Sequence, residues 1–203
     1  MTTTLTATLL ASNPQLYSRA TRPPFLQAAS EGTVSKTRLA CWLAADGIYV
    51  RLYVQAIGRV LSGPHLRLDD DDDDGFFSWL VDGLVGLRAE MALFERVADE
   101  YGLDLQVDVG HNKGLALFTQ LFSSTDHHQQ ETSWFDPAVL FFATERIYLD
   151  AWTTSHQNLL PSSSPQTTDS DAGALRTTLM PNWSSPHLDR LRRPYGRHSR
   201  RRV

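Results

Sequence analysis

Cysteine is the residue that the sequence has least of: Cys41 is the only one among 203 residues. A single cysteine excludes an internal disulfide framework and zinc sites built from several thiolates, which favours an intracellular, reduced protein. The sequence also lacks an uncharged apolar run of the roughly 20 residues that a membrane-spanning helix needs. Its N-terminus has neither the basic segment nor the long apolar segment of a secretory signal. We therefore expect a cytoplasmic protein without a membrane partner.

Acidic residues are absent from the C-terminal end of the chain. Residues 190–203 contain seven arginines, whereas all 23 acidic residues lie before them, and the net charge of the whole chain is −4. A basic segment of this kind can bind nucleic acid, but a short charged terminus is more often a solvated tail. We expect residues 192–203 to form a disordered Arg-rich tail, and we expect no nucleic-acid partner.

Metal-binding patterns are also lacking. No expected helix carries the His-x-x-x-His or Glu-x-x-His pairs found in the metal sites of helical bundles. A calcium loop needs ligands at alternating positions with a turn glycine and usually other oxygen ligands, so the consecutive aspartates Asp69–Asp74 do not by themselves indicate one. Their mutual repulsion favours an extended loop before the next helix. The sequence therefore predicts neither a metal site nor a cofactor.

What the sequence does contain is apolar residues that recur three and four positions apart. This spacing is that of amphipathic helices, and it is sustained from Ser35 to about Leu61. Further helices are expected at QLYSRAT after Asn13 and Pro14, PPFLQAAS before Gly32, GFFSWLVDGLVGLRAEMALFERVADEYGL, KGLALFTQLF, AVLFFATERIYLDAWTT after Asp136 and Pro137, and MPNWSSPHLDRL. The fold class is therefore all-α, a helical bundle that forms one domain over residues 1–191, with a Ser/Thr/Pro-rich loop at 156–178.

The long helix carries a carboxylate on its apolar face. At about 100° per residue, Asp46, Tyr49 and Tyr53 lie within about 60° of one another, together with Leu39 on the same stripe. Cys41 lies about 140° away from Asp46, so the two side chains do not face the same space. Because no base shares the face of Cys41, we expect this cysteine to be a packing residue and not a nucleophile.

A second helix repeats the pattern with Glu145, Tyr148 and Trp152. Carboxylates are rarely buried without a partner, so two inward acids among large aromatics predict a ligand pocket. There the rings would stack on a planar heterocycle, one acid would accept a hydrogen bond from an amine, and the other would shuttle a proton. The alternative is that Asp46 and Glu145 bond to tyrosine hydroxyls or to each other and only fix helix register. The spacing leaves both interpretations open.

The same residues lie in segments that resemble a known family. PPFLQAASEGTVSKTRLACWLAADGIYVRLYVQAIGRVL contains a prolyl-phenylalanine segment, a Gly-Thr turn and a W-L-x-x-D-x-x-Y helix, in the order found in the TenA/THI-4 (thiaminase-2) family. LFFATERIYLDAW and MPNWSSPHL resemble later blocks, most like those of the fungal members. The resemblance covers roughly residues 12–155 and 179–191. It implies a haem-oxygenase-like helical bundle, commonly a homo-oligomer, that hydrolyses thiamin or salvages its degraded aminopyrimidine.

The resemblance also implies roles for individual residues. Asp46 is implied as the acid that contacts the aminopyrimidine, and Thr144 stands at the position of the family's nucleophilic cysteine. The chain resembles the branch in which the adjacent glutamate, Glu145, replaces that cysteine. A glutamate would activate a water or protonate a leaving amine, which favours amide or amine hydrolysis of a thiamin breakdown product over thiamin cleavage. The expected substrate-binding residues are Tyr49, Tyr53, Phe25, Phe118 in place of a family tyrosine, Tyr148 and Trp152.

The C-terminal sequence departs from the family pattern. Family members continue into a long final helix that closes the bundle and supplies a catalytic glutamate, and DRLRRPYGRHSRRRV stands in its place. The resemblance therefore implies a bundle that is incomplete at its C-terminus. Two functions remain open: a hydrolase acting on a small pyrimidine ligand, with Glu145 and Asp46 as the catalytic pair, or a non-catalytic binding or regulatory protein on the same scaffold.

Overall fold

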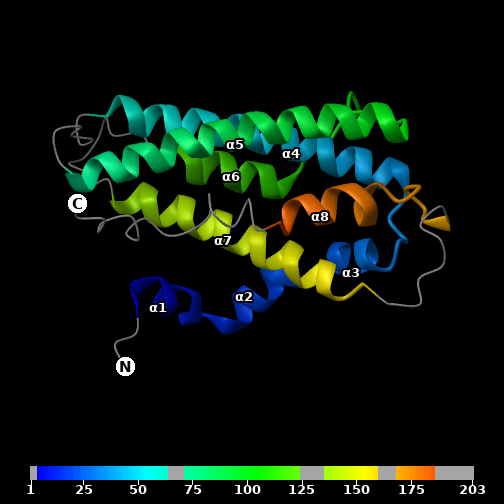
Figure 1. Ribbon diagram of the computed structural model, residues 1–203, viewed down its shortest axis with the longest axis horizontal. Helices are drawn as coiled ribbons and strands as arrows, with labels where there is room; N and C mark the ends of the chain where they lie inside the picture. The colour runs from blue at the N-terminus through cyan, green and yellow to red at the C-terminus, as the bar shows by residue number, and fades with distance from the viewer. Residues whose placement is uncertain (1–3, 64–70, 124–134, 160–167, 186–203) are drawn as a thin grey trace, which may run out of the picture. The chain divides into compact units, whose positions relative to one another are not determined.

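The computed structural model describes residues 4–63, 71–123, 135–159 and 168–185. Predictions that concern Asp69 and Asp70, the Arg-rich tail, and the closing helix after Ser185 fall outside these residues. The elements are α1 (Leu5–Ala11), α2 (Pro14–Thr21), α3 (Pro24–Ser30), α4 (Lys36–Ser62), α5 (Asp71–Tyr101), α6 (Lys113–Ser123), α7 (Phe135–Gln157), the π-helix η2 (Ala174–Leu179) and α8 (Met180–Trp183) (Figure 1). No strand occurs in these ranges, so the all-α class is confirmed.

Contacts between residues divide the chain into two compact units. Unit 1 combines residues 1–36 with 140–194, and unit 2 combines residues 37–139 with 195–203. The described part of unit 1 therefore contains α1, α2, α3, most of α7, η2 and α8, whereas α4, α5 and α6 belong to unit 2. The organisation of residues 1–191 as one domain stays a prediction.

Unit 2 is built on two long helices whose buried faces follow the predicted spacing. The helices run side by side in Figure 1, and Gly83 of α5 faces α4, since a Cβ at this position would be in ordinary van der Waals contact with Ile57 Cδ1 of α4, at 3.8 Å. Burying one large apolar side chain is worth about 1.5–3 kcal/mol, so the two stripes hold the pair together. The buried residues are Leu39, Leu43, Val50, Tyr53, Ile57 and Val60 on α4, and Phe76, Leu80, Leu87, Phe94 and Val97 on α5.

Unit 1 begins with short helices whose ends are set by local signals. Asn13 caps α2 as predicted, because its Oδ1 accepts a hydrogen bond from the Leu16 N–H at 3.0 Å. Gly32 follows α3 with φ of 70°, the left-handed conformation that glycine adopts without strain. Across the unit, Ser155 Oγ of α7 donates to the Leu26 carbonyl of α3 at 2.9 Å. This bond ties α3 to α7.

The loop predicted for residues 156–178 is wrong at both ends. α7 continues through His156 to Gln157, and Ala174–Leu179 forms a π-helix with buried residues. Asp171, 1% exposed, starts this turn by accepting hydrogen bonds from the N–H groups of Gly173 and Leu175, each at 2.9 Å. The Ser/Thr-rich composition does not reveal this order, because part of the stabilisation comes from buried polar contacts, in addition to the buried Leu175 and Leu179.

Three helix starts also differ from the prediction. α1 is absent from the predicted helices, and it buries no residue of its own. α5 begins at Asp71, so part of the aspartate run is helical where an extended loop is predicted. α7 begins at Phe135, which puts Asp136 in its first turn instead of at its cap. The helix dipole favours an acidic residue such as Asp136 in the first turn of a helix.

Candidate functional site

Four aromatic rings of unit 2 meet where α4 faces α6. Tyr49 lies edge-on to Phe118 with ring centroids 4.9 Å apart, and Tyr53 stacks on Phe122 at 5.2 Å. Tyr53 and Phe122 are buried, whereas Tyr49 and Phe118 are half-buried. The three predicted binding residues of this unit therefore form one cluster. Phe122 is a further member, and its position one turn after Phe118 on an amphipathic helix is the signal that identifies it.

Asp46 lies on α4, one turn before Tyr49, and it is half-buried. The residues on its helix face, Leu39 and Tyr53, are 0% and 3% exposed, so the carboxylate stands at the edge of the core and not inside it. A half-buried carboxylate is accessible to the N–H donor of a ligand. Cys41 is also half-buried.

A second aromatic cluster lies in unit 1. Trp152 of α7 packs on Trp183 of α8 with ring centroids 4.5 Å apart, and Tyr148 lies 6.0 Å from Trp183. Phe25 of α3 meets the edge of Trp152 at 6.5 Å. The predicted residues Phe25, Tyr148 and Trp152 are therefore brought together. Trp183 is missing from the predicted site, although it lies in the quoted MPNWSSPHL segment.

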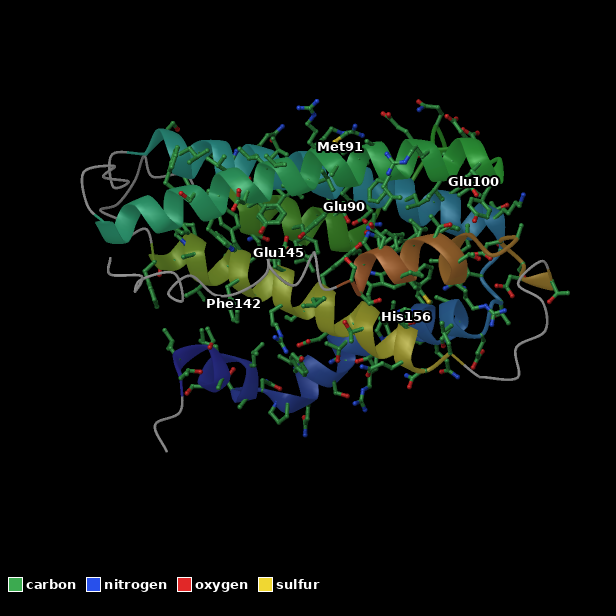
Figure 2. All side chains as sticks on the ribbon, viewed as in Figure 1. Glu90, Met91, Glu100, Phe142, Glu145 and His156 are labelled. Atoms are coloured by element: carbon green, nitrogen blue, oxygen red, sulfur yellow. The ribbon has the colours of Figure 1, made fainter. Side chains whose placement is uncertain are left out.

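Glu145 lies on α7, one turn before Tyr148, and it is half-buried. Figure 2 shows Phe142, Glu145 and His156 following one another along this helix. The neighbouring Thr144 Oγ1 lies 2.9 Å from the Phe141 carbonyl and donates its proton within the helix. A hydroxyl bonded in this way has no base to activate it as a nucleophile. Glu145 is thus the group at this point of α7 that can take part in proton transfer.

Tyr17 of α2 is bonded to α7 through a network that the sequence does not reveal. Its hydroxyl donates to Asp150 Oδ2, and Arg146 Nε lies 2.8 Å from the same oxygen. Burial, reinforced by the hydrogen bond and the charge of Asp150, raises the pKa of Tyr17 to about 12. The phenol therefore stays protonated and serves as a donor that ties α2 to α7. Its partner lies 133 residues away in the chain, so no local pattern signals the contact.

A serine and a histidine also meet in unit 1. His156 Nδ1 of α7 lies 2.6 Å from Ser184 Oγ, and Ser184 Oγ donates to the Met180 carbonyl at 2.7 Å. A serine hydroxyl has one proton, so Ser184 accepts its bond from the imidazole N–H. This pair links α7 to the end of α8 and is not an activated nucleophile.

The predicted site residues thus fall into two groups. Asp46, Tyr49, Tyr53 and Phe118 belong to unit 2, and Phe25, Glu145, Tyr148 and Trp152 belong to unit 1. Within each unit the aromatic members contact one another, whereas a single pocket that holds both acids stays a prediction. Over the described ranges, no three His, Cys, Asp or Glu side chains are grouped so as to hold a metal ion. In that part of the chain no helix has the length and apolar character needed to cross a membrane.

The fold is similar to that of a solved TenA homologue from Pyrococcus furiosus. The TM-score is 0.63 at 17% sequence identity, and the match covers 93% of this chain and 82% of the homologue. A probable bifunctional TENA-E protein of Glycine max is 29% identical over 101 residues. The first comparison is a likeness in fold, and the second is a likeness in sequence to a TenA-type protein. The haem-oxygenase-like bundle that the sequence resemblance implies is therefore the fold of this chain.

The sequence match to the TenA/THI-4 family is partial in length. It spans 50% of this chain and 43% of the Glycine max relative, less than half of that protein. No protein-family model matches the chain. The W-L-x-x-D-x-x-Y segment from Trp42 to Tyr49 lies within α4, and TERIYLDAW lies within α7.

Proposed function

We propose that the chain binds an aminopyrimidine of thiamin metabolism and hydrolyses a C–N bond in a thiamin breakdown product. The observation that carries the proposal is the arrangement on α4, where the half-buried Asp46 lies one turn from Tyr49, itself in contact with Phe118. The likeness to TenA-type proteins in sequence and in fold supports the substrate class.

In this proposal, Asp46 recognises the ring and the aromatics position it. The carboxylate of Asp46 accepts a hydrogen bond from the exocyclic amine of the pyrimidine, a charge-assisted bond worth about 1.5–3 kcal/mol. Tyr49 and Tyr53 offer flat faces against which a planar heterocycle stacks. The half-buried Tyr49 and Phe118 are the accessible members of their cluster, so they are the rings that a ligand reaches first.

Glu145 is the proposed acid and base for the hydrolysis. Its carboxylate removes a proton from water as the water oxygen bonds to the carbon that bears the nitrogen. The C–N bond then breaks, and the same group returns the proton to the departing amine. Thr144 takes no part, because its hydroxyl is bonded to a helix carbonyl. Tyr148 and Trp152 line the site from the same helix.

A binding experiment tests the recognition role. Calorimetric titration with hydroxymethyl- and aminomethyl-aminopyrimidine should give saturable binding, and Asp46→Asn should weaken it by about tenfold or more. Asp99→Asn is the matched control, since Asp99 is an exposed carboxylate on α5 of the same unit. If the wild type and Asp46→Asn bound the aminopyrimidines with equal affinity, Asp46 would not be a ligand-binding residue.

A turnover experiment separates the enzyme from a binding protein. Release of ammonia or of the amine from aminopyrimidine substrates should fall by about 10²–10⁴ in Glu145→Gln, with binding retained. Glu95→Gln, a change at an exposed glutamate of α5, should leave the rate unchanged. Ligand binding without any turnover in the wild type would support a non-catalytic binding protein on the TenA/THI-4 scaffold.

A further inference from the structure

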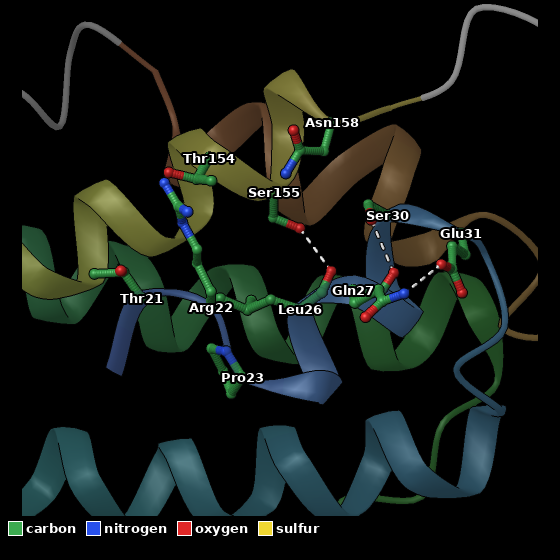
Figure 3. Close-up of a pocket in the computed structure, with 10 residues that line it drawn as sticks. All are labelled: Thr21, Arg22, Pro23, Leu26, Gln27, Ser30, Glu31, Thr154, Ser155 and Asn158. Atoms are coloured by element: carbon green, nitrogen blue, oxygen red, sulfur yellow. Dashed lines mark hydrogen bonds between the residues drawn. The ribbon is translucent and has the colours of Figure 1, made fainter. Parts of the chain in front are cut away.

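A cavity of about 310 Å³ lies in unit 1 between α3, the turn before it, and the end of α7 (Figure 3). Its floor contains the buried residues Thr21, Leu26, Ser30 and Ser155, and its rim is formed by exposed polar and charged side chains. None of the residues of the proposed aminopyrimidine site lines it. A ligand of this cavity would therefore be separate from the aminopyrimidine, and the lining residues indicate its chemistry.

The floor presents hydrogen-bond acceptors. Three hydroxyls line it, and each has already given its proton to a backbone carbonyl: Ser155 to Leu26 at 2.9 Å, Ser30 to Gln27 at 2.8 Å, and Thr21 to Tyr17 at 2.9 Å. A hydroxyl with its proton engaged offers only lone pairs. Gln27 adds another acceptor, because its Nε2 donates to Glu31 Oε1 at 2.9 Å and leaves its carbonyl oxygen available. This surface is suited to a ligand that donates protons.

The rim carries one charge of each sign, at opposite ends of α3. Arg22 precedes the helix and Glu31 follows it, so their backbones are on the order of 12 Å apart. In Figure 3 the Arg22 side chain extends toward Thr154, on the other side of the cavity from Glu31. Within the described ranges the Arg22 guanidinium makes no hydrogen bond or ion pair. Arg22 is also the C-cap residue of α2, where the helix dipole favours a cation. Glu31 lies at the end of α3, where the dipole disfavours an anion, so helix stability does not account for the placement of Glu31.

We propose that this cavity binds a small linear zwitterion, with its carboxylate at Arg22 and its ammonium group at Glu31. The guanidinium supplies paired donors to the carboxylate. The ammonium has three protons for acceptors, and Glu31, the Gln27 carbonyl and the Ser30 hydroxyl supply them. The proposal uses no residue of the proposed aminopyrimidine site and stands apart from it.

An NMR titration of the whole chain with 6-aminohexanoate tests the proposal, with hexanoate and hexylamine as single-charge analogues. We expect saturable shifts at Gln27, Glu31 and Asn158, and weaker binding of both analogues. Because both charged side chains are exposed, Arg22→Gln and Glu31→Gln should each lower the affinity for 6-aminohexanoate by about two- to fivefold. Arg19→Gln is the matched control, since Arg19 is an exposed arginine of α2 that does not line the cavity.

The charge assignment has its own test. In Arg22→Gln, 6-aminohexanoate should bind no better than hexylamine, and in Glu31→Gln it should bind no better than hexanoate, because each variant removes one pairing. Equal binding of the three compounds by the wild type would overturn the proposal. The proposal would also be overturned if Arg19→Gln lowered the affinity as much as Arg22→Gln does, or if the chemical shifts of the cavity residues did not change on titration.

Discussion

Trp152 and Trp183 pack against each other with ring centroids 4.5 Å apart and planes inclined by 37°. The two side chains are 2% and 0% exposed, and the edges of Phe25 and Tyr148 meet them from the sides. This contact attaches the C-terminal described segment to α7. The pair is part of the buried core of unit 1 and includes or contacts residues that the proposed function uses.

Removal of the Trp183 ring should strongly destabilise the protein. Trp183→Ala leaves a large cavity beside Trp152, and we expect a loss of about 3–5 kcal/mol in the free energy of unfolding, measured by urea denaturation. Trp183→Phe should lose less, because it keeps an aromatic ring. Leu16→Ala is the control, since Leu16 is 56% exposed and its truncation should change stability by no more than about 0.5 kcal/mol. Similar losses for Trp183→Ala and Leu16→Ala would contradict the burial of the pair.

Two glycines with similar backbone conformations should respond differently to alanine. Gly32 has φ of 70° and Gly102 has φ of 65°, so a side chain strains both by about 1–2 kcal/mol. A Cβ at Gly32 would also lie 2.5 Å from Asp169 Oδ1, whereas nothing lies within 4 Å at Gly102. Gly32→Ala should therefore lower the thermal midpoint clearly more than Gly102→Ala.

The collision at Gly32 has a specific cause. Asp169 is held in place by its buried ion pair with Arg176. The side chain of Asp169 is 3% exposed and that of Arg176 is 7% exposed. A carboxylate fixed in this way cannot turn aside without leaving a buried charge unpaired. Equal midpoints for Gly32→Ala and Gly102→Ala would mean that Asp169 moves freely.

Asp171 should matter more than other aspartates that make the same kind of bond. It accepts from two backbone N–H groups while 1% exposed, and Asp171→Ala leaves both donors buried without acceptors. The expected cost is about 1–3 kcal/mol for each donor. Asp104→Ala is the control, because Asp104 Oδ1 accepts from the Gln106 N–H at 2.9 Å in an exposed turn where water can replace it. Hydrogen exchange at Gly173 and Leu175 measures the local effect.

Tyr17 should give the protein an alkaline stability limit. Its pKa is about 12 in the folded state against an ordinary value of 10.0, so the folded state holds the proton more tightly than the unfolded state. The resulting stabilisation is fully present below about pH 10 and is lost as the pH rises toward about 12. Tyr17→Phe should therefore show a flatter decline of unfolding free energy over this interval.

The control for Tyr17 is a tyrosine outside the network. Tyr101→Phe, at the end of α5, should keep the alkaline slope of the wild type. Tyr17→Phe should also cost about 0.5–1.5 kcal/mol at neutral pH through the lost bond to Asp150. Identical alkaline slopes for the wild type and Tyr17→Phe would show that the phenol is not the titrating group.

The sequence predicts most of the helices because a helix depends on the spacing of apolar residues and on capping residues that are close together in the chain. Apolar spacing identified α4, α5, α6 and α7, and the Asn13 cap and the Gly32 terminus are where the local rules put them. The same spacing grouped Tyr49 with Tyr53 on α4, and these rings do contact each other at 5.9 Å. These features depend on residues within one or two turns.

The sequence by itself determined the all-α class, the principal helices and which side chains share a helix face, because each of these follows from interactions between residues close in the chain. Only the tertiary structure decided which faces meet: Trp183 with Trp152, Phe122 with Tyr53, Tyr17 with Asp150, and Asp169 with Arg176 beneath Gly32. The π-helix at Ala174–Leu179 belongs to the same class. Its order comes from buried polar partners as well as from the buried Leu175 and Leu179, and the pairing of polar groups has no periodic pattern in the sequence.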